Sequence, residues 1–265
     1  MNLGLIVVAL LLVSYSICVR EDNTIEAGKH RDCPYFVRLT TILLDENINL
    51  MTASLGGTPI SNRWIVTSAR RLATYEFDTL AIYVYACEIK DINFVHPIAI
   101  GNFWIFHPRL KPAEVTLNVV SIHEYDIALV LCDRAVDDSD LMKPVKNTMP
   151  ARQFQGIFML SCVGIIELRV SNSQIFTRYI EFHAERLYIE GLPDYQVAFI
   201  INLGYDIITP SIYGGSVMSS GRLFGIVSSF QVTGWNSRRE MKVIIVVSVI
   251  ERFVPWINSV TGPIL

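Results

Sequence analysis

Residues 60–69 read Ile-Ser-Asn-Arg-Trp-Ile-Val-Thr-Ser-Ala, and this stretch restricts the fold more than any other part of the sequence. Its centre consists of aromatic and β-branched residues, which favour an extended strand because they pack well on a pleated surface. The stretch therefore predicts a short strand over residues 64–68. The pair Gly56-Gly57, a few residues earlier, is typical of a turn and is expected to precede that strand.

Short runs of the same kind follow along the chain, separated by turn residues such as Asn102, Pro108, Gly191 and Gly221. Regular short strands separated by such turn residues predict an all-β sandwich or barrel. The region 250–260 places apolar residues on one stripe and predicts a short helix, and 141–155 is expected to cross between two halves. The expected strands are 35–44, 64–68, 80–85, 115–121, 127–131, 157–162, 165–170, 175–182, 197–203, 216–218, 223–230 and 241–249.

Composition excludes several classes of protein. The chain has 265 residues, of which 51% are hydrophobic and 18% are charged, so it is too apolar for a mainly disordered protein. With a formal net charge of −3, the chain lacks the excess of basic residues that nucleic-acid binding requires. It also lacks a run of basic residues that could bind an anionic membrane. We therefore expect neither a nucleic-acid partner nor a membrane surface.

The N-terminus resembles a secretory signal peptide. Residues 1–16 carry no charge, and 3–13 form an apolar run of the length of a signal-peptide core, too short to cross a bilayer. No lysine or arginine precedes the run, and a buried N-terminal strand or helix is the alternative. We expect a signal peptide over 1–16, with cleavage at 16–18, a lead-in over 17–24 and a secreted, extracellular protein. The apolar stretch 243–250 is also too short for a membrane span.

Five cysteines are present: Cys18, Cys33, Cys87, Cys132 and Cys162. Cleavage after Cys18 would leave four, which allow three pairings, and an oxidising compartment makes bridges plausible. The spacings do not match a zinc site. We expect no metal and no cofactor.

Five segments, in order, resemble the trypsin/chymotrypsin-like serine protease family. The strand at 60–69 resembles the family's I-x-x-x-W-V-L-T-A-A run. The others are 33–39 (first strand, P-Y-Q-V-S-L), 125–130 (N-D-I-A-L-L), 214–217 with 221–228 (G-D-S-G-G-P-L and the strand after it) and 254–257 (Y-x-x-W-I). The resemblance covers the chain from about residue 25. It implies two packed six-stranded antiparallel β-barrels in a domain over 25–262, with the first barrel at about 35–140, the second at about 155–249 and a short C-terminal helix at about 250–260.

The family's catalytic histidine, aspartate and serine fall, by this resemblance, on Arg70, Asp126 and Tyr213. Arginine keeps its proton near neutral pH, because its pKa is about 12 or above, and cannot act as a base. A tyrosine is bulkier than serine and has a pKa of about 10. His123 precedes Asp126 but is expected to be an ordinary loop or edge histidine. The degenerate triad Arg70, Asp126 and Tyr213 should converge in one cleft between the two barrels.

The oxyanion-hole positions correspond to Ser211 and Tyr213. Ile212 replaces the aspartate that binds the new N-terminal amine in activated family members, and Thr24 stands where a basic cleavage residue is expected. An amine buried without a carboxylate is costly. The resemblance therefore implies neither tryptic activation nor a preformed oxyanion hole.

The specificity pocket is altered as well. Ile207 stands where trypsin-like members carry aspartate, and the wall includes Ser228 and Phe230, the latter in place of a glycine that keeps the slot open. Cys33 with Cys162 and Cys87 with Cys132 is one pairing that the family fold would permit, although connectivity does not follow from sequence.

These positions imply a secreted, catalytically inactive homologue of serine proteases: a binding or regulatory protein in a protease cascade, or a competitor for an inhibitor or substrate. Its protein partner is not identifiable from sequence. A serine-type endopeptidase or other hydrolase with residual activity is the alternative, and a β-rich carrier with coincidental motifs is another. Asp126 is expected to pair with Arg70, and Tyr213 to plug the former pocket or to form an aromatic contact surface.

Overall fold

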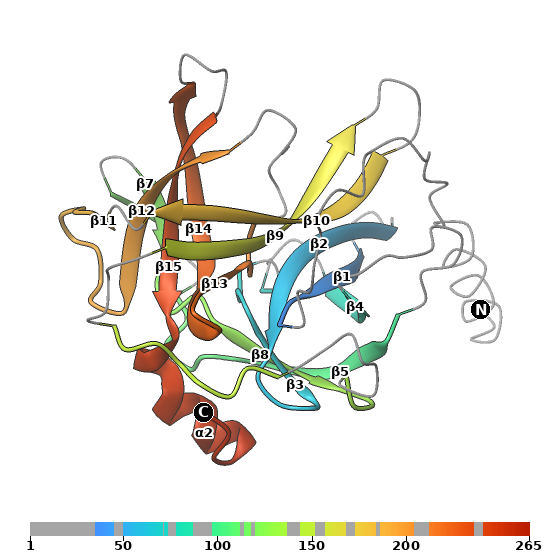
Figure 1. The fold of residues 1–265 in the computed structure, drawn as a ribbon. Helices are drawn as coiled ribbons and strands as arrows, with labels where there is room; N and C mark the ends of the chain where they lie inside the picture. Colours follow the sequence, from blue (N-terminus) through green and yellow to red (C-terminus); the bar gives the residue numbers. More distant parts are fainter. Residues whose placement is uncertain are drawn as a thin grey trace.

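The computed structural model describes residues 35–44, 50–70, 72–73, 78–86, 97–111, 114–117, 120–136, 144–151, 157–167, 173–183, 186–203, 212–235 and 241–265. These residues form a closed barrel, a larger second sheet, a small two-stranded sheet and one short C-terminal helix (Figure 1). The predicted fold class, all-β with a C-terminal helix, is confirmed. Among the described residues, no helix is long and apolar enough to cross a membrane.

The first half of the chain closes into a six-stranded barrel in the order β1-β2-β3-β8-β5-β4. Alternate side chains of these strands point inward, and a core that includes Leu39, Leu55, Ile65 and Val130 fills the barrel. The strands are β1 (Val37–Leu44), β2 (Leu50–Pro59), β3 (Trp64–Thr67), β4 (Asp78–Ala86), β5 (Ala99–Phe106) and β8 (Ala128–Cys132).

The predicted turn at Gly56-Gly57 is wrong, because both glycines lie inside β2. Gly57 pairs with Val37 across the sheet, and a Cβ on it would meet a methyl group of Ile65 at 2.7 Å. This glycine therefore makes room for the barrel core instead of reversing the chain.

The second half forms a seven-stranded antiparallel sheet in the order β10-β9-β13-β14-β15-β12-β11. The resemblance implied a closed barrel of six strands here; the described pairings instead give an open sequence that ends at β10 and β11. Phe158, Phe199 and Phe224 pack against one another in its core. The strands are β9 (Ile157–Glu167), β10 (Ser173–His183), β11 (Arg186–Leu187), β12 (Gln196–Leu203), β13 (Ser216–Ser219), β14 (Arg222–Trp235) and β15 (Met241–Val249).

A small hairpin replaces the single strand that was predicted over 115–121. β6 (Glu114–Leu117) pairs with β7 (Val120–His123) in a two-stranded sheet. Val120 and Ile122 are buried against side chains of β12 and β15, so the hairpin covers the outer face of the second sheet. Two hydrogen bonds hold it there, from Ser229 Oγ to the Ser121 carbonyl and from Gln196 Nε2 to the His123 carbonyl.

The chain ends in a 3₁₀ turn, η1 (Ile250–Phe253), followed by α2 (Val254–Thr261). Pro255 lies in the first turn of α2, where its missing N–H removes no helical hydrogen bond. Ile250, Phe253 and Ile257 are buried in a core shared with residues of both sheets. The helix therefore packs across the base of the molecule (Figure 1).

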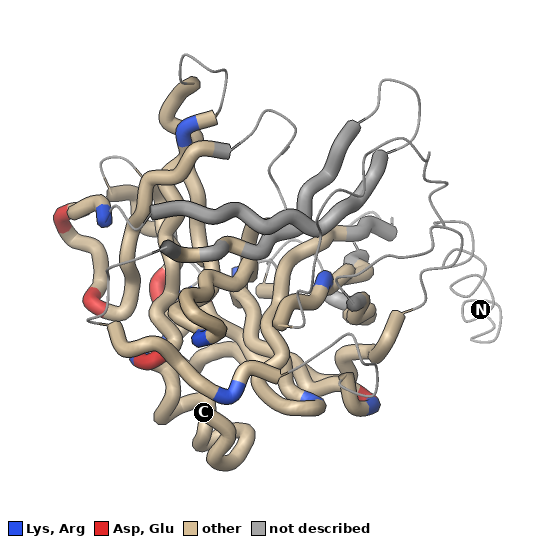
Figure 2. Tube along the Cα trace, in the orientation of Figure 1, with Lys and Arg blue, Asp and Glu red and all other residues tan. Residues whose placement is uncertain are grey.

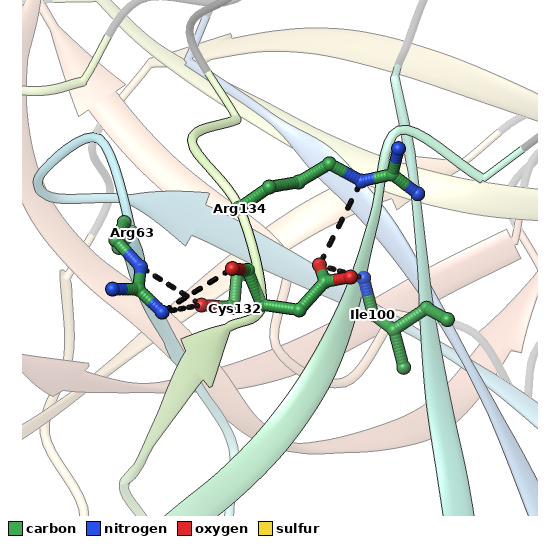
Figure 3. Close-up of polar contacts among 5 residues, drawn as sticks. Arg63, Ile100, Cys132 and Arg134 are labelled. Atoms are coloured by element: carbon green, nitrogen blue, oxygen red, sulfur yellow. Dashed lines mark hydrogen bonds and ion pairs between the residues drawn. The ribbon is translucent and has the colours of Figure 1, made fainter.

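Cys132, at the end of β8, is a free and buried thiol, so its expected pairing with Cys87 is wrong. Burial raises the pKa of this thiol to about 12, with a further contribution from Asp133. The guanidinium of Arg63 donates to the carbonyl oxygens of Cys132 and Asp133, and Asp133 accepts the N–H of Ile100 (Figure 3). Cys18, Cys33 and Cys87 lie outside the described residues, and the side chain of Cys162 is not described.

Candidate functional site

Tyr213 sits on a turn that is held tightly against the barrel. The N–H of Gly56 donates to the Tyr213 carbonyl at 2.8 Å, and Thr67 Oγ1 donates to the Gly56 carbonyl at 2.6 Å. Gly214 has a φ of +72°, and a Cβ there would lie 2.2 Å from the Gly56 carbonyl oxygen. Only glycine permits this approach, which fixes Tyr213 at the junction of the barrel and the second sheet.

Asp126 is fully buried two residues before β8 and accepts two hydrogen bonds from one short segment. Ser68 Oγ donates at 2.7 Å, and the backbone N–H of Arg70 donates at 2.6 Å. Burial raises the pKa of Asp126 to about 6, although these two hydrogen bonds act in the opposite direction. Tyr125, just before it, has a φ of +56°, a left-handed conformation that is uncommon outside glycine and turns the chain here.

The guanidinium of Arg70 contacts Tyr213. Its Nη1 donates to the Tyr213 hydroxyl at 3.0 Å, and its Cζ lies 5.1 Å from the centroid of the Tyr213 ring. The Tyr213 ring in turn lies 5.2 Å from that of Phe230. The expected pairing of Arg70 with Asp126 takes another form among the described contacts: the carboxylate accepts the main-chain N–H of Arg70 and has its pKa lowered by the guanidinium charge, while the guanidinium itself donates to Tyr213.

The structure thus brings Arg70, Asp126 and Tyr213 together from three distant parts of the chain. Tyr213 is only 6% exposed, so its ring fills the junction. Ser68 belongs to the site as well, although the sequence did not single it out. Its position directly after β3 and before Ala69 and Arg70, in the stretch 60–69 that carries the family resemblance, was the available signal.

Ile212 packs with Val217, Val227 and Phe158 in the core of the second sheet. An ammonium group in this apolar setting would find no carboxylate on residue 212. Ile207 and Ser211, expected at the specificity pocket and the oxyanion hole, lie outside the described residues, as does Thr24.

Ser228 and Phe230 differ in their surroundings. Ser228 is buried, donates to the Val246 carbonyl and accepts from Gln196 Nε2, so its hydroxyl is used inside the sheet. Phe230 is half-buried and packs on the core and on Tyr213. Among the described residues, no three histidine, cysteine or acidic side chains gather as metal ligands.

A second aromatic cluster includes Tyr125, the residue directly before Asp126, and was not predicted from the sequence. The ring of His107 stacks on Tyr125 with centroids 4.9 Å apart, and Tyr125 stacks on Tyr195 at 4.4 Å. Trp256 of α2 meets the edge of His107. Burial, and secondarily Arg109, lowers the pKa of His107, whose Nδ1 accepts the Arg109 N–H. The cluster supports the left-handed turn at Tyr125.

The comparisons with known proteins give a fold and no sequence relative. Neither a protein-family model nor a curated protein matches the chain. Solved structures do match. HL collagenase has a TM-score of 0.56 at 17% identity, over 86% of this chain and 94% of that chain. Neuropsin, a serine protease of mouse brain, has a TM-score of 0.54 at 17% identity, over 86% and 94%. Kallikrein-related peptidase 10, in complex with Zn²⁺, has 0.50 at 14%, over 86% and 95%.

Identities this low establish the fold alone. The order of the barrel strands, the second sheet, the C-terminal helix and the match along most of the chain agree with one another. The chain therefore has the fold of the trypsin-like serine proteases.

Proposed function

We propose that this protein is a secreted, non-catalytic homologue of the trypsin-like serine proteases that acts as a binding or regulatory protein. Within that class, the proposal includes a role in a protease cascade or competition with active proteases for an inhibitor or substrate. The contact between Arg70 and Tyr213 carries the proposal. A permanently protonated guanidinium cannot accept a proton from a nucleophile, and here it donates to the hydroxyl instead.

Two further observations support this reading. The Tyr213 side chain is buried, whereas a nucleophile has to reach the substrate carbonyl. Ile212 contributes a hydrocarbon side chain to the core, at the place where the resemblance puts the carboxylate of the activation switch. Each of these residues would have to change before acyl-transfer chemistry could proceed by the family route.

Hydrolysis of a broad panel of peptide substrates tests the proposal. The native chain is compared with the double variant Arg70→His, Tyr213→Ser and with Tyr213→Phe, after circular dichroism has shown that each variant is folded. We expect no turnover by the native chain. Turnover that Tyr213→Phe abolishes would overturn the proposal and make Tyr213 a nucleophile.

Secretion has its own test, because it rests on the uncharged segment 1–16. We expect the chain expressed in a secretory cell to reach the medium with a new N-terminus at 16–18, which N-terminal sequencing detects. A chain that stays inside the cell with Met1 in place would contradict this part of the proposal.

A further inference from the structure

Tyr188 is the most exposed of the large hydrophobic side chains that the structure describes, with 85% of its surface in solvent. It directly follows β11, a terminal strand of the second sheet, whose pairing with β12 ends at Leu187. Another enzyme therefore reaches this hydroxyl more readily than those of the other tyrosines whose burial is described. Those tyrosines are buried or half-buried: Tyr35, Tyr83, Tyr85, Tyr125, Tyr195 and Tyr213.

The neighbours of Tyr188 hold it in this position. Leu187 and Ile189, on either side of it, pack against the core that β12, β15 and the β6–β7 hairpin share. The chain then turns, since the N–H of Leu192 donates to the Ile189 carbonyl at 3.2 Å and Gly191 has a φ of +82°. A phenol between two anchored residues presents its hydroxyl without any movement of the chain.

The segment around Tyr188 is acidic. Residues 185–194 contain three acidic residues and one basic residue, which gives a net charge of −2 in a chain whose total is −3. Glu190 and Asp194 are exposed, and Figure 2 shows red segments on the loop that joins β11 to β12. Tyr188 therefore lies in a negatively charged setting that remains open to solvent.

We propose that the Tyr188 hydroxyl is sulfated while the protein passes through the secretory route. The donor is a phosphate–sulfate anhydride, used by a sulfotransferase of that compartment. The phenol oxygen attacks the sulfur and forms an oxygen–sulfur bond, while the bond from sulfur to the phosphate oxygen breaks. The phosphate leaves with the electron pair, the phenol proton passes to a base of the transferase, and nothing is oxidised or reduced. This inference rests on the secretion that the proposed function includes.

Charge and access both favour transfer at this residue. An enzyme that binds an anionic donor carries positive charge in its cleft, and this charge attracts an acidic segment and speeds association. A protein that reaches the late secretory compartments is already folded, so the acceptor has to be exposed in the native state. In the described part of the chain β11 pairs only with β12, which leaves the outer edge of the strand open to the enzyme.

Two preparations of the full-length chain test the proposal. In the first, the purified and folded protein is incubated with a tyrosine sulfotransferase and a radiolabelled sulfate donor. In the second, the protein is collected from the medium of secretory cells. Proteolysis after glutamate releases residues 186–190, Arg-Leu-Tyr-Ile-Glu, in which Tyr188 carries the only phenol or alcohol group. We expect labelled sulfate on this peptide in the first preparation and the sulfated peptide in the mass spectrum of the second.

Matched variants locate the modification. Tyr188→Phe should remove the label from the protein. Tyr83→Phe, which changes a half-buried tyrosine on β4, should leave the labelling unchanged. Glu190→Gln should slow the labelling, because it removes one acidic charge from the segment. Far-UV circular dichroism shows that each variant is folded.

The outcomes separate this inference from the proposed function. An unlabelled 186–190 peptide, equal total label in Tyr188→Phe and the native chain, or a secreted chain without sulfate at Tyr188 would overturn the proposal. Phosphate in place of sulfate, which a phosphatase removes and accurate mass distinguishes, would overturn it as well. Labelling of the purified protein, combined with a cellular chain that keeps Met1 and stays inside the cell, would instead overturn the secretion and leave the acceptor site supported.

Discussion

Replacing Gly214 by alanine tests the contact that holds the Tyr213 turn against the barrel. At the φ of +72° an L-residue costs about 1–2 kcal/mol relative to glycine. The added Cβ would also meet the Gly56 carbonyl oxygen at 2.2 Å and Thr67 Oγ1 at 2.5 Å. One of these atoms is backbone, and the other is held by a hydrogen bond, so neither yields easily.

The turn would have to move away from the barrel and would stretch the hydrogen bond from Gly56 N–H to the Tyr213 carbonyl. Overpacking of this kind costs about 1–3 kcal/mol, and together with the backbone term we expect Gly214→Ala to lower the free energy of unfolding by about 2–5 kcal/mol. Such a loss is a large part of the stability of a typical domain.

Gly221→Ala is the matched control. Gly221 also has a φ of +72°, but an added Cβ would have nothing within 4 Å. We expect only the backbone term of about 1–2 kcal/mol. Urea unfolding followed by far-UV circular dichroism measures both variants, with slopes compared to check that the two states are the same. Equal losses would refute the reasoning, because the close approach at Gly214 would then contribute nothing.

Three further predictions concern titratable groups. The pKa of Asp126 rises from 3.8 to about 6 on folding, so the native state binds the proton more tightly and stability falls, by about 3 kcal/mol, as pH rises from about 4 to 6. Asp126→Asn should remove this slope in urea titrations at several pH values, and an unchanged slope would contradict the burial argument. The pKa of His107 is lowered from 6.5, so its contribution has the opposite sign: stability is lost as pH falls below about 6.5, and His107→Gln should flatten that loss. Cys132, with its pKa raised to about 12, should react with a thiol reagent only after unfolding; native chain and Cys132→Ala should therefore consume equal amounts of reagent when folded and different amounts in denaturant.

The sequence carried enough information to predict the fold class, but less to predict the topology of the second half of the chain. The strands β3, β8 and β15 are short apolar runs, and the residue types in such runs are sufficient to predict a strand. β6 and β7 were merged into one strand, because the alternation of Val115 and Leu117 continues to Val119 in the sequence and conceals the reversal between them. Whether a sheet closes depends on the twist and length of all its strands, so the open order from β10 to β11 was not predictable from any one segment.

The sequence predicted which residues come together at the site, but it did not predict the contacts that their side chains make. Resemblance along the chain brought together Arg70, Asp126 and Tyr213. It could not tell where the long side chain of Arg70 points, because several rotamers reach different partners from the same backbone. The aromatic cluster at His107 combines residues from separate loops and from α2, and no local pattern connects them in the sequence.

The difference between the two sheets has a consequence for behaviour at high concentration. A closed barrel offers no terminal strand, whereas the second sheet, in the described part of the chain, ends at the eleven-residue strand β10, which pairs only with β9. Terminal strands are templates for pairing with another chain. Aggregation of a partly unfolded molecule should therefore begin at β10, and protein handled under mild denaturing stress should form assemblies through its C-terminal half while the barrel remains intact.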